Sequence, residues 1–139
     1  MPEVSIVIPL YNEEACVGPL VSELDSFIEG FERSCEVILV DDGSTDDTVA
    51  VASSLLASRA SYRLIVLSTN RGQTTAMAAG LDQAQGEFIV FMDGDLQNSP
   101  HDIPILLAKM EEGYDLVSGW RRDRKDRTVS RKIPSKVAN

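Results

Sequence analysis

The sequence has few of the residues that commonly perform chemistry or form cross-links. Its 139 residues include one histidine, His101, and two cysteines, Cys16 and Cys35. His101 falls in the first turn of a predicted helix, which is typical of a surface residue rather than of a ligand or a catalytic base. The cysteines lie in or beside predicted regular structure, which favours reduced thiols with a packing role over a disulfide framework.

Long hydrophobic runs are also absent. The N-terminus passes from Met1 through Pro2 and Glu3 into a short apolar run, without the basic start and long apolar segment of a signal peptide. No run approaches the length needed to span a membrane. We therefore expect this chain to be soluble, and its length predicts one domain with a substantial hydrophobic core.

Positive charge is scarce in most of the chain. Residues 1–120 hold 5 Lys or Arg against 20 Asp or Glu, whereas residues 121–139 hold 8 against 2. The acidic body argues against nucleic acid as a partner, and the basic segment 121–139 suits a phosphate group or an anionic membrane surface. The alternative for that segment is a solvated, partly disordered end. Charge thus divides the chain into 1–120 and 121–139.

Short apolar runs rich in Val and Ile alternate with helical patterns along the chain. Such runs are typical of strands that a parallel sheet buries on both faces, and the alternation predicts a doubly wound, mainly parallel α/β sheet. The predicted strands are Val4–Ile8, Val37–Val40, Leu64–Leu67, Phe88–Met92 and Leu116–Ser118.

Helix starts carry their own signals. Ser44 with Asp47 fits a capping box before the second helix, and Ser99 followed by Pro100 fits an N-cap and first helical residue for the fourth. The third helical segment, TTAMAAGLDQA, is rich in small residues, which predicts a close approach to its neighbour.

In an α/β sheet of this kind, ligands bind beyond the carboxyl ends of the strands. Three acidic stretches follow predicted strands: PLYNEE, DDGSTDD and DGDLQN. No glycine-rich phosphate loop is present, so backbone amides alone are not the predicted phosphate site. Asp93 and Asp95 could instead hold Mg²⁺ or Mn²⁺, which keeps open positions for diphosphate oxygens, with Gly94 allowing a tight bend between them.

Each of these motifs has a simpler interpretation. Asp93-Gly94-Asp95 is also good turn chemistry, and Asp41 with Asp42 could form a turn before the second helix. Tyr11 could pack as a hydrophobic staple, and Asn12 could cap the first helix.

Four ordered motifs resemble the catalytic domain of family 2 glycosyltransferases with the GT-A (Rossmann-like) fold. They are VSIVIPLYNEE, VILVDDGSTDDT, NRGQTTAMAAGLDQAQGEFIVFMDGDLQNSP and VSGWRRDRKDRTVSRKIPSK. They are most similar to the polyprenyl-phosphate branch that includes dolichyl-phosphate mannose synthase. The resemblance covers nearly the whole chain.

The resemblance implies roles for particular residues. The nucleotide would be bound by Pro9, Tyr11, Asn12, Glu13, Asp41, Asp42, Asp93 and Gly94. The divalent cation, Mg²⁺ or Mn²⁺, would be held by Asp93, Asp95 and Gln97. Catalytic charge would come from Asp93, Asp95, Arg121, Arg122 and Arg131, and the acceptor phosphate would meet Arg131, Ser135 and Lys136.

The implied reaction is inverting, metal-dependent transfer of a sugar from a nucleoside-diphosphate sugar, by analogy a UDP-sugar, to a polyprenyl phosphate. A hydroxyl acceptor would need a general base, and the sequence after Asp95 offers no convincing one. An ionised lipid phosphate needs none. A soluble or polysaccharide acceptor is the alternative within the family, although the Gln-x-x-Arg-Trp motif of processive synthases is absent.

Members of this branch continue into interfacial or membrane-spanning helices. The resemblance therefore implies a catalytic domain truncated at Asn139, from a protein anchored at the cytoplasmic side of a membrane in lipid-linked glycan or cell-wall biosynthesis, with homo-oligomerisation left open.

Two other classes also use acidic strand ends: haloacid dehalogenase-like phosphatases and receiver-type regulatory domains. The first places its Asp-x-Asp after the first strand, and the second needs an aspartate after the third strand, where Ser68 and Thr69 stand.

Overall fold

The fold was analysed in a computed structural model that describes residues 1–97, 99–113, 116–118 and 129–131. The chain divides into two compact units, Met1–Pro100 and His101–Asn139. Each unit is described by itself. The sequence predicts a division between residues 120 and 121, based on charge. These residues lie outside the described ranges, so the division stays a prediction.

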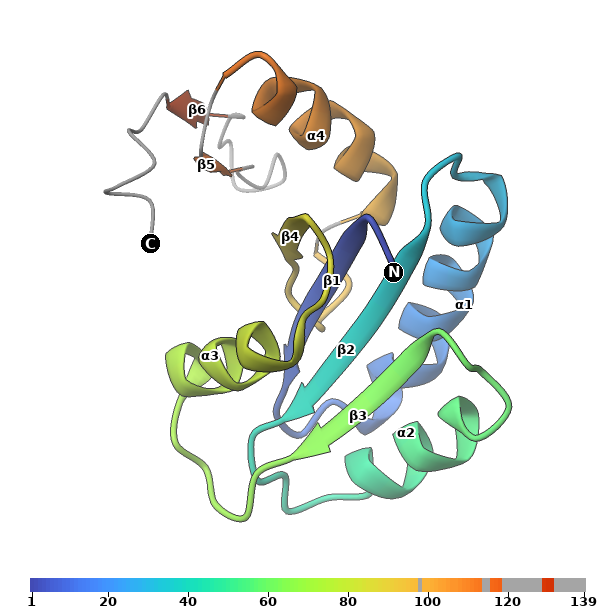
Figure 1. Ribbon diagram of the computed structural model, residues 1–139. Coiled ribbons are helices and arrows are strands. Elements are labelled where there is room, and N and C mark those ends of the chain that lie inside the picture. The colour runs from blue at the N-terminus through green and yellow to red at the C-terminus, as the bar shows by residue number, and fades with distance from the viewer. Residues whose placement is uncertain (98, 114–115, 119–128, 132–139) are drawn as a thin grey trace. The chain divides into compact units, whose positions relative to one another are not determined.

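The first unit is built on a four-stranded parallel sheet with the strand order β3-β2-β1-β4. Its strands are β1 (Val4–Leu10), β2 (Cys35–Asp41), β3 (Tyr62–Val66) and β4 (Phe88–Phe91). Four of the predicted strands therefore lie in one parallel sheet, as expected. In Figure 1 the arrowheads of β2 and β3 lie at the same end of the sheet, as parallel pairing requires.

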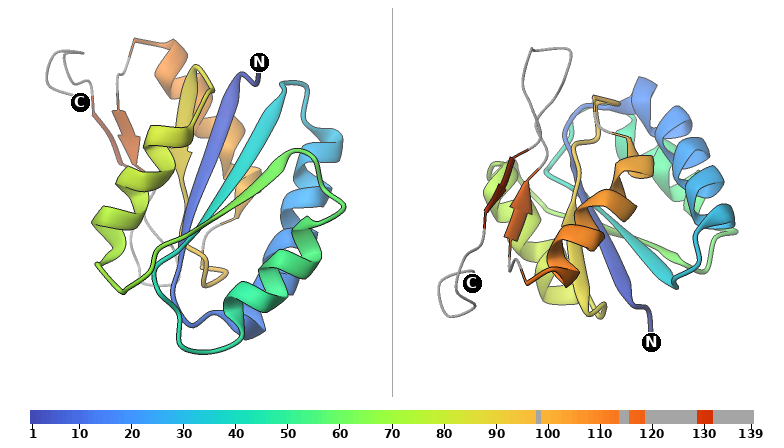
Figure 2. Two further views of the ribbon diagram at one scale, coloured as in Figure 1. Left: turned by 60° about the horizontal axis from the view of Figure 1, so that its bottom comes forward. Right: turned by 90° about the horizontal axis from the view of Figure 1, so that it is seen from above.

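Helices cover both faces of this sheet. Figure 2 shows α1 (Glu14–Gly30) and α2 (Thr48–Leu56) on one face and α3 (Gln73–Gln83) on the other. The doubly wound arrangement is therefore confirmed. The central strands are apolar on both faces because both faces are covered, and β1 buries every residue except Pro9, which is half-buried. On its own side, α1 buries Val17, Leu20, Val21, Leu24 and Phe27.

Small residues let α3 lie close to the sheet, as the sequence predicted. Ala76 is fully buried in a cluster with Val7, Ile38 and Val40. A Cβ atom added to Gly80 would overlap Val7 Cγ1 and lie 3.1 Å from Val40 Cγ2. The helix is therefore held at a distance that only a glycine permits at this position.

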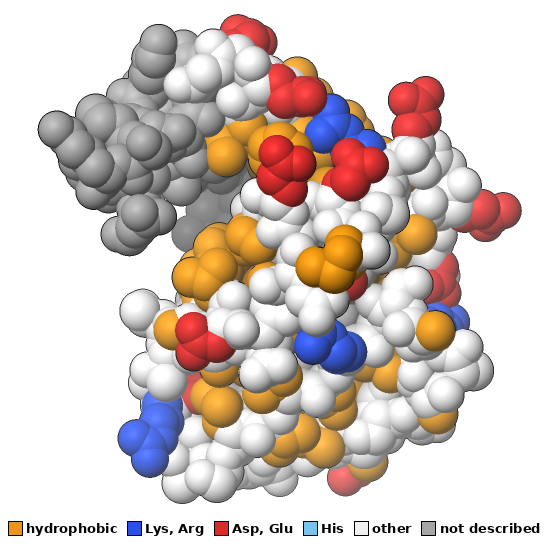
Figure 3. All heavy atoms as spheres, in the orientation of Figure 1, with side chains coloured by type: hydrophobic (Ala, Val, Ile, Leu, Met, Phe, Trp, Pro, Cys, Tyr) orange, Lys and Arg blue, Asp and Glu red, His pale blue; other side chains and the backbone are white. Residues whose placement is uncertain are grey.

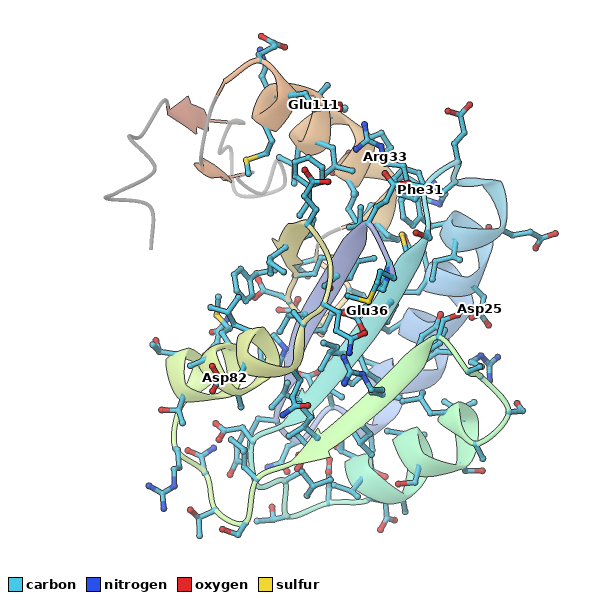
Figure 4. The ribbon with its side chains drawn as sticks, viewed as in Figure 1. Asp25, Phe31, Arg33, Glu36, Asp82 and Glu111 are labelled. Atoms are coloured by element: carbon cyan, nitrogen blue, oxygen red, sulfur yellow. The ribbon has the colours of Figure 1, made fainter. Side chains whose placement is uncertain are left out.

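Two polar networks tie the elements of the first unit together, and Figure 4 labels an acidic residue in each, Asp25 on α1 and Glu36 on β2. Asp25 accepts hydrogen bonds from Arg59 Nη2 at 2.8 Å and from the Tyr62 hydroxyl at 2.6 Å. The hydrogen bond from Arg59 is the main reason that the pKa of Asp25 is lowered.

The second network is buried at the amino end of the sheet. Glu36, which is 8% exposed, accepts hydrogen bonds from the Ser5 hydroxyl, from the backbone N–H of Gln85 at 2.7 Å and from Arg63 Nη2 at 2.7 Å. Burial is the largest single influence and raises the pKa of Glu36, but these donors together outweigh it and the pKa is lowered. The network joins β1, β2 and β3 to the segment before β4.

A 3₁₀ turn, η1 (Pro100–Asp102), includes the last residue of the first unit and the first two residues of the second. The second unit also contains α4 (Ile103–Glu111) and an antiparallel pair of strands, β5 (Leu116–Ser118) and β6 (Val129–Arg131). Leu116–Ser118 is a strand, as predicted, but its expected place in the parallel sheet is wrong. It pairs with β6 in a separate two-stranded sheet, a partner that local hydrophobicity cannot reveal. His101 is exposed in η1, as expected.

The predicted capping box of the second helix is wrong, whereas the fourth helical segment does begin at Pro100, as predicted. The second helix begins at Thr48, and Ser44 hydrogen-bonds to Asp41 rather than to the helix. The fourth α-helix begins at Ile103, after a 3₁₀ turn that starts at Pro100. Ser99, the expected N-cap, donates its hydroxyl hydrogen to Glu23 at 3.2 Å.

Candidate functional site

Four loops leave the carboxyl ends of the parallel strands in the first unit. Leu10 and Asp41 are register partners at the ends of β1 and β2, and Val66 ends β3 opposite Asp41. β4 ends earlier, because Phe91 is paired with Val7. The residues after β4 therefore run along the last residues of β1, and all four loops meet at one edge of the sheet.

The loops after β1 and β2 are fastened to each other by Asn12 and Ser44. The backbone N–H of Asn12 donates to Ser44 Oγ at 2.8 Å, and Asn12 Oδ1 accepts from the backbone N–H of Thr45 at 2.8 Å. Asn12 adopts φ 52°, a left-handed conformation that asparagine tolerates better than most residues. Its side chain thus braces the neighbouring loop and does not cap α1, whose N-cap has no side-chain hydrogen bond.

Asp41 is the buried anchor of this connection. Its carboxylate is fully buried and accepts hydrogen bonds from the Ser44 hydroxyl at 2.6 Å and from the Ser44 backbone N–H at 2.9 Å. A buried carboxylate needs such donors, because unpaired burial of a charge is costly. Asp41 therefore shapes the loop that carries Asp42 and Gly43.

Asp42 fastens the loop after β2 to the loop after β3. It is 3% exposed and accepts hydrogen bonds from the backbone N–H groups of Arg71 at 2.8 Å and Gly72 at 2.9 Å. Gly43 has φ 71°, and a Cβ atom there would lie 2.5 Å from the backbone of Thr69 and Asn70. The two loops are therefore in direct backbone contact.

The Asp93-Gly94-Asp95 turn sits directly on the end of β1. A Cβ atom on Gly94 would lie 2.5 Å from Leu10 Cδ2 and 3.1 Å from the Pro9 carbonyl oxygen, so the site requires glycine for lack of space. The chain bends at Gly94, as predicted, although its φ is not in the left-handed region. The left-handed residue is Leu96, at φ 66°, and a bulky side chain in that conformation is a strained feature of the kind that clusters at functional sites.

Hydrogen bonds orient both aspartates. Gln73 Nε2, at the start of α3, donates to Asp93 Oδ1 at 3.1 Å, and the backbone N–H of Gln97 donates to Asp95 Oδ1 at 3.1 Å. Asp93 and Asp95 are half-buried, and Gln97 is exposed. Gln73 is a site residue that the sequence did not single out; it is the first residue of α3, after the loop that leaves β3 at the same edge of the sheet.

The β4 loop also lies near the start of α1. Burial first, then a hydrogen bond to Glu13 and the negative charges of Glu13 and Asp95, raise the pKa of the Cys16 thiol. Cys35 is likewise a free thiol, and burial raises its pKa to about 11. Both cysteines are thus unpaired, as expected, and neither has the lowered pKa of a nucleophilic cysteine.

Whether a divalent cation fits this turn depends on the donor chemistry. Asp93 and Asp95 offer carboxylate oxygens, the ligands that Mg²⁺ and Mn²⁺ prefer, and the Gln73 amide and Gln97 N–H that hold them are uncharged. Among the described residues, no three His, Cys, Asp or Glu side chains are grouped closely enough to hold a metal by themselves. The donor chemistry of the two aspartates therefore fits a divalent cation that takes its remaining ligands from other molecules.

Other predicted site residues lie at the same edge or outside the described ranges. Tyr11 is 43% exposed, which does not fit a buried hydrophobic staple, and Glu13 donates its backbone N–H to Thr48 Oγ1 at 2.9 Å. Arg131 ends β6, and only its backbone is described. The remaining predicted residues, Arg121, Arg122, Ser135 and Lys136, lie outside the described residues.

Charged side chains are spread over the face that Figure 3 shows rather than gathered in one patch. Hydrophobic atoms lie between the acidic and basic side chains in the same view. No helix in the part of the chain that the structure describes has the length and apolar character needed to cross a bilayer.

Comparison with known proteins identifies the family of this chain. The family model "Glycosyl transferase family 2" matches residues 5–137. The chain is 47% identical over 139 residues to a dodecaprenyl-phosphate galacturonate synthase of Rhizobium johnstonii, covering 99% of this chain and 41% of that protein. It is 42% identical over 137 residues to an undecaprenyl-phosphate 4-deoxy-4-formamido-L-arabinose transferase of Shewanella sediminis, covering 98% and 41%. The chain thus spans about two fifths of the length of these curated relatives.

A solved structure shows the same fold. Glucosyl-3-phosphoglycerate synthase from Mycobacterium tuberculosis, in complex with Mn²⁺, UDP and glucosyl-3-phosphoglycerate, superposes with a TM-score of 0.68 and 25% identity over 86% of this chain and 44% of that one. The expected GT-A fold is confirmed, and the phosphatase and receiver-domain alternatives are excluded by the family match. The parallel sheet, the four loops at its carboxyl edge and a family match over residues 5–137 lead to one assignment: this chain belongs to glycosyl transferase family 2.

Proposed function

We propose that this chain is the nucleotide-sugar-binding part of an enzyme that transfers a sugar from a nucleoside-diphosphate sugar to a polyprenyl phosphate. The observation that carries the proposal is the Asp93-Gly94-Asp95 turn, seated on the end of β1 and oriented by Gln73. The names of the relatives support the acceptor class, since both contain a prenyl phosphate.

Asp93 and Asp95 would hold Mg²⁺ or Mn²⁺ against the diphosphate. The cation would supply positive charge next to a leaving group that gains negative charge as the sugar departs. The Mycobacterium tuberculosis synthase was solved with both Mn²⁺ and UDP, which supports a metal and a uridine nucleotide at the corresponding edge. Gln97 is the further metal ligand that the family resemblance implies.

The loops after β1 and β2 would bind the nucleoside. Pro9, Tyr11, Asn12 and Glu13 would line the base and ribose, and Asp41 and Asp42 would face them from the other loop. Both carboxylates already accept backbone hydrogen bonds and are almost fully buried. Their main contribution in this proposal is therefore to hold the loop backbones in a binding shape before the nucleotide arrives.

The transfer itself needs no protein base when the acceptor is a phosphate. An ionised oxygen of the lipid phosphate forms a bond to the anomeric carbon, the bond from that carbon to the diphosphate breaks, and the nucleoside diphosphate leaves with the electron pair. Arg121, Arg122 and Arg131 would offset phosphate charge, and Ser135 and Lys136 would contact the acceptor. The basic segment 121–139 would also attract an anionic membrane surface toward an acidic body.

Calorimetric titration of the 139-residue chain with UDP and with GDP, each with and without Mn²⁺, tests the nucleotide half of the proposal. We expect one nucleotide to bind more tightly with Mn²⁺, and Asp93→Asn to weaken the metal-dependent binding by at least about tenfold. Asp82→Asn is the matched control, because Asp82 is an exposed aspartate on α3 (Figure 4). Binding that is indifferent to Mn²⁺ would contradict the proposal.

The acceptor is tested with the full-length protein and a radiolabelled nucleotide sugar. Sugar transfer to undecaprenyl phosphate is expected, with a loss of about 10²-fold or more in rate for Asp93→Asn. Transfer to a soluble phosphorylated acceptor instead would overturn the lipid assignment while leaving the nucleotide site intact.

A further inference from the structure

Gln73 contacts a predicted metal ligand from a different loop. It is the first residue of α3, and its side-chain Nε2 donates a hydrogen bond to Asp93 Oδ1 at 3.1 Å across 20 residues of sequence. Gln73 is exposed, whereas Asp93 is half-buried. Packing therefore does not force the amide toward the carboxylate, and the hydrogen bond itself accounts for the placement.

The backbone below Gln73 is held in place by the preceding loops. Asp42 accepts hydrogen bonds from Arg71 and Gly72, the two residues before Gln73. Gly72 is the N-cap of α3 and has φ 101°, a conformation that favours glycine. The side chain of Gln73 therefore starts from a fixed point at the edge of the sheet, and α3 itself is fixed by the contact of Gly80 with Val7 and Val40.

We infer that Gln73 is a positioning residue that orients the Asp93 carboxylate for the divalent cation. The inference rests on the proposed function, because it assumes that Asp93 binds a metal with the nucleotide. Residues that hydrogen-bond to a metal-binding carboxylate commonly fix its orientation, and their loss lowers metal affinity or activity by about 10- to 100-fold. An amide suits this task because it donates a hydrogen bond without adding a positive charge that would oppose the cation.

A purely structural role for the same hydrogen bond makes a different prediction. If Gln73 only joined α3 to the β4 loop, its loss would lower stability and would weaken nucleotide binding equally with and without metal. If Gln73 orients Asp93, its loss acts on the metal-dependent part of binding alone. The ratio of nucleotide affinities with and without Mn²⁺ separates the two roles.

The test uses Gln73→Met in the 139-residue chain, because methionine is close in length to glutamine and lacks the amide. Gln83→Met is the matched control, because Gln83 is an exposed glutamine at the other end of the same helix. Its hydrogen bond with Arg63 is made by the backbone carbonyl oxygen, which the substitution keeps. Calorimetry with UDP and GDP, with and without Mn²⁺, is expected to show about a 10- to 100-fold loss of metal-dependent affinity for Gln73→Met. Metal-free affinity and the midpoint of thermal unfolding should match those of Gln83→Met.

Two results would overturn the inference while leaving the proposed function standing. The first is metal-dependent nucleotide binding that is lost in Asp93→Asn but unchanged in Gln73→Met. The second is an equal loss with and without Mn²⁺, which would show a structural role. Gln73→Ala provides a second variant should Gln73→Met unfold. Nucleotide binding by the unmodified chain that does not respond to Mn²⁺ would instead refute the proposed function, and this inference with it.

Discussion

Replacing Ser44 with alanine tests whether the hydrogen bonds between the loops after β1 and β2 determine the shape of the site. The substitution removes the hydroxyl that donates to Asp41 at 2.6 Å and accepts from the Asn12 N–H at 2.8 Å. A hydrogen bond to a charged group contributes about 1.5–3 kcal/mol, and Asp41 is fully buried, so water cannot easily replace the hydroxyl. Asn12 is exposed, and water can satisfy its N–H.

The total cost should therefore be about 2–3 kcal/mol, nearly all of it from Asp41, which keeps its second hydrogen bond from the Ser44 backbone. In urea-induced unfolding, this loss should lower the midpoint by roughly 1 M with an unchanged slope. Ser54→Ala is the matched control, because Ser54 is an exposed serine within α2 and alanine is the better helix former. A difference between the two variants below about 0.5 kcal/mol would refute the role of Asp41 as a buried anchor.

Two further predictions concern the packing and charge of the first unit. Glu36→Gln should make stability fall less steeply as the pH is lowered. The pKa of Glu36 is lowered in the folded state, so its ionised form stabilises the fold at pH values above its ordinary pKa of 4.5. This contribution is lost as the pH falls through the folded-state pKa. Urea unfolding between pH 7 and pH 3 measures this, with the exposed Glu29→Gln as control, and parallel curves for the two variants would count against it. Gly80→Ala should cost up to about 2 kcal/mol, because overpacking against Val7 costs about 1–3 kcal/mol and alanine gains only about 1 kcal/mol in a helix. Gly30→Ala, where a Cβ meets nothing within 4 Å, should be neutral or stabilising in the same thermal or urea assay, and a Gly80→Ala variant as stable as Gly30→Ala would show that α3 can move away from the sheet.

Much of the fold could be predicted because its signals are local. Each of the strands β1, β2, β3 and β4 contains a run of consecutive apolar residues, so each run indicates a strand without reference to its neighbours. The small residues of α3 likewise indicate close packing, and Gly80 shows it. The order of strands and helices then leaves few topologies open.

Hydrogen-bond partners of polar residues could not be predicted in the same way. Ser44 has the local pattern of a helix cap, yet it bonds to Asp41 and Asn12, and the Ser99 hydroxyl donates to Glu23 on α1. A hydroxyl or a carboxylate can satisfy several partners equally well, and the nearest one in space is set by packing. The same reason explains why the prediction that Leu116–Ser118 belongs to the parallel sheet is wrong. Its hydrophobic pattern indicates a strand but does not identify the strand it pairs with.

The sequence by itself determined that acidic stretches would follow parallel strands and meet at one edge of a sheet, because strand direction and periodicity are properties of short segments. Only the tertiary structure decided how those stretches are held. The end of β1 leaves room for glycine alone at position 94, Asp42 fixes the start of α3, and Gln73 reaches Asp93 from that helix. Such contacts join segments that lie far apart in the sequence, and they form only when the packing of strands and helices brings their atoms within hydrogen-bonding distance.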